Sequence, residues 1–103
     1  MEYRIIKSPS ENVIAILKNR IKSQNIEDIE AVDAIGLVQG RMIDMVVAAD
    51  IAEKSNNVFV SDVNGACPQN MIMMAILGDT ASVEASIDSI KMNFEKEISH
   101  DYS

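Results

Sequence analysis

The sequence predicts a single α+β domain in which helices pack against a β-sheet. Its 103 residues suit one hydrophobic core. The composition is 48% hydrophobic and 24% charged, as in folded proteins rather than disordered chains. Apolar residues alternate along the chain between strand-type and helix-type spacing, in the order βα, βα, ββ, α. Strands separated by helices, together with one adjacent pair of strands, predict a mixed sheet in an α/β sandwich.

The first strand is expected at residues 3–6, and a helix follows it. We interpret Ser8 as the N-cap of this helix, Pro9 as its first helical residue and Glu11 as the acid of a capping box. The helical spacing of apolar residues continues to a basic last turn, so this helix is expected to end near Ser23.

The middle of the chain predicts one connection, one strand and one helix. Residues 24–30 are polar and acidic and indicate a connection. Residues 31–38 are mostly apolar without helical period, which favours a strand buried on both faces, and Gly36 inside it indicates a close backbone approach. Residues 42–56 form the strongest predicted helix, so apolar that we expect it to pack on more than one neighbour.

The last elements are two strands and a helix. Residues 58–63 alternate in polarity and residues 71–77 form an apolar run, and each predicts a strand. Asp79 or Thr80 can cap the final helix. The single domain, residues 1–103, is divided into a strand, helix and connection, a strand-helix-strand-strand-helix body and a polar tail, at residues 1–30, 31–95 and 96–103.

The charge and the cysteine count restrict the function and the compartment. A formal charge of −7 repels phosphate backbones and anionic lipids, so no nucleic acid and no membrane are expected as partners. One cysteine cannot form an internal disulfide, and no signal segment or membrane-spanning apolar run is evident. We therefore expect a cytoplasmic protein.

Two stretches together resemble the bacterial microcompartment shell proteins, the BMC-domain family. They are "DAIGLVQGRMIDMVVAADIAEKSNNV" at residues 33–58 and "GDTASVEASIDSI" at residues 78–90. The first holds the Ala-Ala-Asp step of the family's helix, ending at Asp50, and a lysine near the helix end, Lys54. The second holds the Gly-Asp start and the Val-Glu-Ala pattern that ends at Ala85. The combination is specific, whereas each piece alone is weak.

The N-terminal "RIIKSPSENVIAIL" resembles the strand and short helix that common members of the family carry at their C-terminus. Its position at the start of the chain implies a circularly permuted member. The Cys-Pro-containing loop further resembles the GrpU-like shell proteins of glycyl-radical propanediol compartments.

The resemblance implies a cyclic homohexamer in a polyhedral shell, with one loop of each subunit near the sixfold axis. Six copies of Cys67 would then converge and could together hold an iron–sulfur cluster of the 4Fe-4S type, for electron transfer or cluster delivery across the shell. Gly65 would give the loop freedom to turn and Pro68 would stiffen it. The expected pore-loop residues are Asn64, Gly65, Ala66, Cys67, Pro68 and Gln69.

The resemblance also implies partners and an edge residue. Other shell proteins and encapsulated glycyl-radical pathway enzymes are the expected partners. Lys54 is expected at the hexamer edge, although a lysine there also suits the last turn of a helix. Where common members have an arginine before the proline of the edge motif, this chain has Ser8, so packing between hexamers is expected to differ.

Two alternatives to the cluster-binding tile remain at this point. The first is a plain shell tile with a metabolite pore, in which Cys67 is a small apolar residue. The second is a small α+β regulatory or ligand-binding protein that shares the sandwich pattern. The sequence has no CxxC motif, no Gly-rich phosphate loop and no nucleophile paired with histidine, so we expect no catalytic residues and no enzyme.

Overall fold

The structure is a computed structural model, and it describes residues 1–21, 32–55, 57–65 and 71–95. The predicted connection at 24–30 and the predicted tail lie outside the described residues. The elements in chain order are β1 (Glu2–Lys7), α1 (Glu11–Arg20), β2 (Ala34–Arg41), α3 (Met42–Ser55), β3 (Phe59–Val63), β4 (Met71–Gly78) and α4 (Thr80–Glu95).

The four strands form one sheet in the order β1-β2-β4-β3, and every pair of neighbours is antiparallel. The predicted mixed sheet was therefore wrong. The strands on either side of α3 do run in the same direction, but β4 inserts between them and pairs antiparallel with both. Parallel neighbours need a crossover connection, but a helix between two strands does not make them parallel neighbours. The neighbours β1 and β2 are also joined through a helix, α1, and they too are antiparallel.

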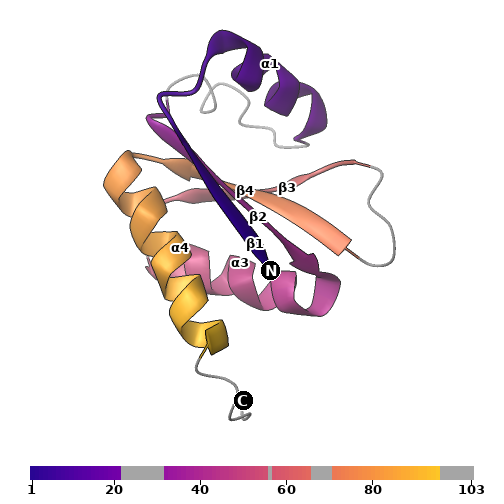
Figure 1. Cartoon of the computed structure of the whole chain (residues 1–103), viewed down its shortest axis with the longest axis vertical. Helices are drawn as coiled ribbons and strands as arrows, with labels where there is room; N and C mark the ends of the chain where they lie inside the picture. Colours follow the sequence, from indigo (N-terminus) through magenta and orange to yellow (C-terminus); the bar gives the residue numbers. More distant parts are fainter. Residues whose placement is uncertain (22–31, 56, 66–70, 96–103) are drawn as a thin grey trace.

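Helices cover both faces of the sheet (Figure 1): α1 lies on one face, and α3 and α4 lie on the other. Strand β4 is apolar from Met71 to Leu77, and β2 carries apolar side chains at Ala34, Ile35, Leu37 and Val38, so each strand contributes side chains to both faces. Ile76 packs with α3 and α4, whereas its neighbour Leu77 packs with α1. The predicted burial of these two strands on both faces is confirmed, with the first found at Ala34–Arg41 rather than 31–38.

The close backbone approach predicted at Gly36 is confirmed. A Cβ atom at this position would lie 2.9 Å from Ile87 Cδ1 and 3.0 Å from Val83 Cγ1. Both contacts come from α4, which packs across β2. The missing side chain therefore lets α4 lie directly on the sheet.

Helix α1 begins and ends at residues other than those predicted. Its N-cap is Ser10, whose hydroxyl accepts a hydrogen bond from the Val13 N–H at 3.3 Å. Ser8, the predicted cap, instead has φ 50° and donates its N–H to the Asp33 carbonyl at 2.8 Å. The helix ends at Arg20, not near Ser23, because the next residue is extended and pairs with β3.

Helix α4 starts as predicted, with Asp79 as its cap. The carboxylate of Asp79 accepts hydrogen bonds from the Ser82 N–H at 2.8 Å and from the Ser82 hydroxyl at 2.9 Å. These two bonds, the backbone bond first, lower the pKa of Asp79 below its ordinary value of 3.8. The predicted alternative cap, Thr80, is the first helical residue.

Candidate functional site

The predicted pore loop leaves the sheet at the end of β3. Val63, the last residue of that strand, pairs with Met73 of β4, and Asn64 and Gly65 follow it. The other predicted loop residues lie outside the described residues: Ala66, Cys67, Pro68 and Gln69. Their roles in a pore therefore stay predictions, and the described residues show how the loop begins.

The first loop residue is bound to the last residue of α1 through two hydrogen bonds. The Asn64 N–H donates to the Arg20 carbonyl at 2.7 Å, and Arg20 Nη1 donates to the Asn64 carbonyl at 3.4 Å. Next to this pair, Ile21 forms an isolated antiparallel bridge with Val63. The C-terminal end of α1 therefore holds the start of the loop through backbone and side-chain contacts together.

Gly65 is the last described residue before the rest of the predicted loop. Its φ is not in the left-handed region, which within the described residues is occupied by Ser8. A Cβ atom at Gly65 would meet Arg20 Nη1 at 3.7 Å, an ordinary contact. The predicted role of Gly65 in the turn stays a prediction, because the rest of the loop lies outside the described residues.

Two hollows adjoin the start of the loop on the α1 side of the sheet. An open hollow of about 410 Å³ is bordered by Arg20 and by the amides of Asn19 and Asn64. A smaller one of about 270 Å³ continues from it under α1, with a floor that includes Leu37 and Met73. Together the two hollows place the positive charge of Arg20 beside a floor of apolar side chains that includes Leu37 and Met73.

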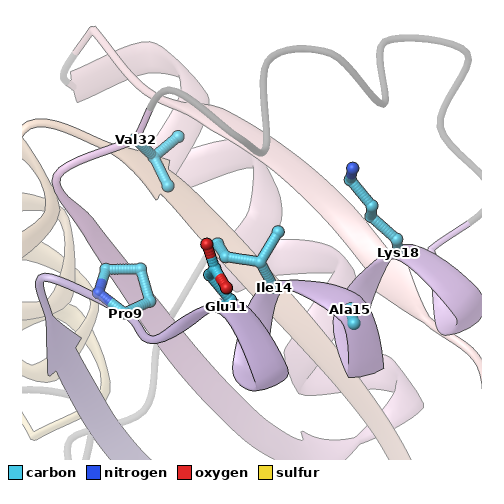
Figure 2. A pocket seen from close by; sticks show the side chains of 6 residues that line it. All are labelled: Pro9, Glu11, Ile14, Ala15, Lys18 and Val32. Carbon is cyan, nitrogen blue, oxygen red and sulfur yellow. The ribbon is translucent and has the colours of Figure 1, made fainter.

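Another hollow, of about 440 Å³, lies on the opposite side of α1 (Figure 2). Glu11 and Lys18 extend from the helix beside it, and Pro9 and Val32 close its other end. It holds charges of both signs and none of the predicted loop residues.

No ready metal site is found within the described part of the chain: no three of its His, Cys, Asp and Glu side chains are grouped closely enough to hold an ion. The chain has a single cysteine, Cys67. An iron–sulfur cluster bound by cysteine thiolates needs more thiolates than one chain supplies. Any such cluster would therefore have to be shared between subunits.

The predicted edge residue, Lys54, lies in the last turn of α3. Its Nζ atom is 3.0 Å from the Asp50 carboxylate one helical turn earlier, and both side chains are exposed. Nothing in the single chain tests a role in hexamer packing, so that role stays a prediction. Within the described residues, no helix combines the length and apolarity that crossing a membrane requires.

The fold and the loop at its edge define a small α+β sheet-and-helix domain, and comparison with known proteins assigns it to a family. The sequence profile of the BMC domain matches residues 34–102, more than half of the chain. The chain therefore belongs to the BMC-domain family. No curated protein sequence matches it.

Two solved structures are similar over most of the chain. One is a ligand-free structure of the GrpU microcompartment shell protein from Clostridiales bacterium 1_7_47FAA, with 53% identity, a TM-score of 0.65 and coverage of 88% of each chain. The other is a ligand-free structure of the GrpU microcompartment shell protein from Pectobacterium wasabiae, with 34% identity, a TM-score of 0.69 and coverage of 87% of this chain and 99% of that one. The resemblance expected from the motifs is confirmed, and a shell role is supported over a small regulatory protein.

Arg20 is the residue of this region that sequence reasoning missed. It stands out in the sequence only as part of the basic last turn of the first helix. Its partner Asn64 is 44 residues further along the chain. Only the fold brings the two together, so no local motif could have identified the contact.

Proposed function

We propose that this chain is a structural tile of a bacterial microcompartment shell and assembles as a cyclic homohexamer with its pore loop at the sixfold axis. Family membership carries the proposal. The position of the loop supports it, because the loop leaves one end of the sheet, where subunits can meet around an axis. The proposed role is structural rather than catalytic, and the shell lies inside the bacterial cytoplasm. Its proposed partners are other shell proteins and encapsulated glycyl-radical pathway enzymes.

The proposal includes a circular permutation, in which β1 and α1 occupy the place that the C-terminal strand and helix hold in common members of the family. The family match begins at Ala34 and so leaves both elements outside it. Yet β1 is an integral strand of the sheet, paired with β2 along six residues from Glu2 to Lys7. An N-terminal strand completing a sheet whose remainder matches the family is the pattern that a permutation produces.

We further propose that Cys67 thiolates from several subunits bind a 4Fe-4S cluster in the pore. Only the assembled ring supplies enough cysteine thiolates for such a cluster, since each chain has one thiol and a ring of six subunits has six. When bound, the cluster would supply one-electron redox chemistry at the shell wall. The chain's own contribution would be to present Cys67 on a loop whose first residue is held by Arg20.

Anaerobic reconstitution tests the tile and the cluster separately. Light scattering after size-exclusion chromatography measures the mass, and visible absorbance with iron and sulfide analysis measures the cluster. We expect a hexamer that becomes brown, and a Cys67→Ser hexamer that stays colourless. A colourless wild-type hexamer would leave the tile in place and remove the cluster.

A plain tile with a metabolite pore is the second candidate. Family membership supports it equally, because both candidates are shell tiles with the same fold. In that case Cys67→Ser would change neither the mass nor the iron content.

A further inference from the structure

One flank of the subunit is the surface of α3 together with the end of β3, which we call the α3 flank: Ile43, Val46, Glu53 and Asp62. Glu53 lies near the C-terminal end of α3, next to Lys54. Ile43 and Val46 are 74% and 64% exposed although both are large and apolar. Beside them, between α3 and strands β3 and β4, lies a hollow of about 270 Å³ bordered by Glu53 and Asp62. The sequence predicted that this helix packs on more than one neighbour, and in the described part of the chain Ile43 and Val46 remain more than half exposed.

The other flank is the surface of α1, which we call the α1 flank: Ile16, Arg20 and the hollow under the helix. Ile16 is 57% exposed. The hollow beside it, about 270 Å³, is floored by Leu37 and Met73. Arg20 is the charged residue that lines it, whereas Lys18 lines the hollow on the opposite side of the helix.

The two flanks lie on opposite faces of the sheet at the same end. Side chains alternate along β3, so Asp62 belongs to the α3 face and Val63 packs in the core under α1. Asn64, which follows, is bonded to Arg20. In Figure 1 the C-terminal end of α1 and the N-terminal end of α3 stand on either side of the end of β3.

We propose that these flanks are the two halves of one head-to-tail contact, with the α3 flank of one subunit packed against the α1 flank of the next copy. This inference rests on the proposed ring, because a ring with its axis at the loop places a neighbour on each side of the loop. Each flank has an exposed aliphatic side chain and a hollow of similar size. Self-pairing of the α3 flank would bring Glu53 and Asp62 against like charges, in a chain that already carries a charge of −7.

The charges on the two flanks are complementary. Glu53 and Asp62 border the hollow of the α3 flank, and Arg20 borders that of the α1 flank. Asp62 and Arg20 both lie beside Asn64, the first loop residue, and so would sit at a similar distance from the ring axis. We therefore pair Asp62 of one subunit with Arg20 of its neighbour.

Mixing two defective variants tests the head-to-tail contact. Ile43→Asp breaks the α3 flank and Ile16→Asp breaks the α1 flank, and both positions are more than half exposed, so each chain should still fold. Each variant alone should associate at least about tenfold more weakly and remain monomeric, a loss of about 1.4 kcal/mol or more. Mixed in equal amounts, they should form a dimer through the one intact flank of each.

Met92→Asp is the matched control, because Met92 is also 57% exposed but lies on α4, outside both flanks. It should assemble as the wild type does. Thermal unfolding of every variant checks that the subunit still folds. Folded variants that keep assembling alone, or a mixture that stays monomeric, would overturn the contact.

Charge reversal tests the pairing within the contact. Arg20→Glu and Asp62→Lys should each weaken association roughly threefold or more, and the double variant should recover most of the loss. Lys18→Glu changes the same charge on the same helix away from the flank and should have little effect. Loss of assembly in the double variant equal to the sum of the single losses would overturn the pairing. If every flank variant still forms the hexamer, the proposed contact is refuted but the ring is not. If the wild type is monomeric, the ring is refuted as well.

Discussion

The two faces of the sheet are packed in different ways. On the face covered by α3 and α4, both helices contribute fully buried side chains, among them Ala48, Ala52 and Ile90. On the other face, Leu17 is the buried residue that α1 contributes, and hollows of about 270 and 440 Å³ run along the helix. The first face is a closed core, and the second leaves room beside its helix.

Helix α1 is held mainly at its two ends. Ser8, just before it, donates to the Asp33 carbonyl at 2.8 Å, and Arg20, its last residue, accepts from the Asn64 N–H at 2.7 Å. The helices on the other face instead pack along their length against each other and against the strands. We therefore expect the stability of the protein to depend mainly on the face covered by α3 and α4, whereas α1 serves to position the start of the loop.

The largest loss of stability is expected when Ile90→Ala, on the α3 and α4 face, is compared with Leu17→Ala on the α1 face. Ile90 is fully buried between tightly packed neighbours, so the truncation leaves a cavity and should cost about 2–5 kcal/mol of unfolding free energy. Leu17 already borders a hollow, so fewer contacts are lost and about 1–2 kcal/mol is expected. Urea unfolding at one fixed protein concentration measures both. Equal costs on the two faces would contradict the comparison.

Gly36→Ala and Gly65→Ala form the next pair. A Cβ atom at Gly36 would overlap side chains of α4, so about 1–3 kcal/mol of stability should be lost. A Cβ atom at Gly65 has room and the backbone there is not left-handed, so the change should stay within about 0.5 kcal/mol. Differential scanning calorimetry compares the two. A Gly65→Ala variant as unstable as Gly36→Ala would show that the loop end is packed more tightly than its contacts indicate.

Ser86 is the polar exception in the closed core. Its side chain is fully buried in α4, and its hydroxyl is without a hydrogen-bond partner in the structure. Ser86→Ala removes that hydroxyl and raises helix propensity, so about 1 kcal/mol of added stability is expected from denaturant unfolding. Ser82→Ala is the control, because it removes a real bond to Asp79 and should destabilise the protein. A loss of stability in Ser86→Ala would reveal a partner for the hydroxyl.

The closed face was also the more predictable from sequence. The periodicities of β2, β4, α3 and α4 are local, and the family motifs lie in β2, α3 and α4, so the existence, order and burial of these elements were predicted. The strand order was not, because the insertion of β4 between β2 and β3 depends on pairing over long sequence distances. Local patterns report which residues are apolar, not which strand comes to lie beside another.

The α1 side was less predictable because its details depend on tertiary contacts. Two serines flank Pro9, and either could cap the helix from sequence alone. Ser8 instead donates its backbone N–H to the carbonyl of the distant Asp33, and Ser10 is the N-cap of the helix. The candidate loop was located through the family resemblance, but its contact with Arg20 joins residues far apart in the chain. Cys67 lies outside the described residues, so its proposed role depends on the assembly experiments.

The smallest expected effect concerns pH, at the cap of α4. Hydrogen bonds from Ser82 lower the pKa of the folded Asp79 below its ordinary value of 3.8. The unfolded chain therefore binds a proton at this carboxyl more readily than the folded one does, and the cap's electrostatic contribution is present above pH 3.8 and lost as the pH falls through the lowered pKa. Asp79→Ala should thus be less stable than the wild type near neutral pH, and the gap should narrow below about pH 4. Asp88→Ala, an exposed acid further along α4, is the control. Protonation removes the charge of Asp79 but not its packing. A stability difference between Asp79→Ala and the wild type that stays constant down to acid pH would therefore show that Asp79 stabilises α4 through packing rather than through its charge.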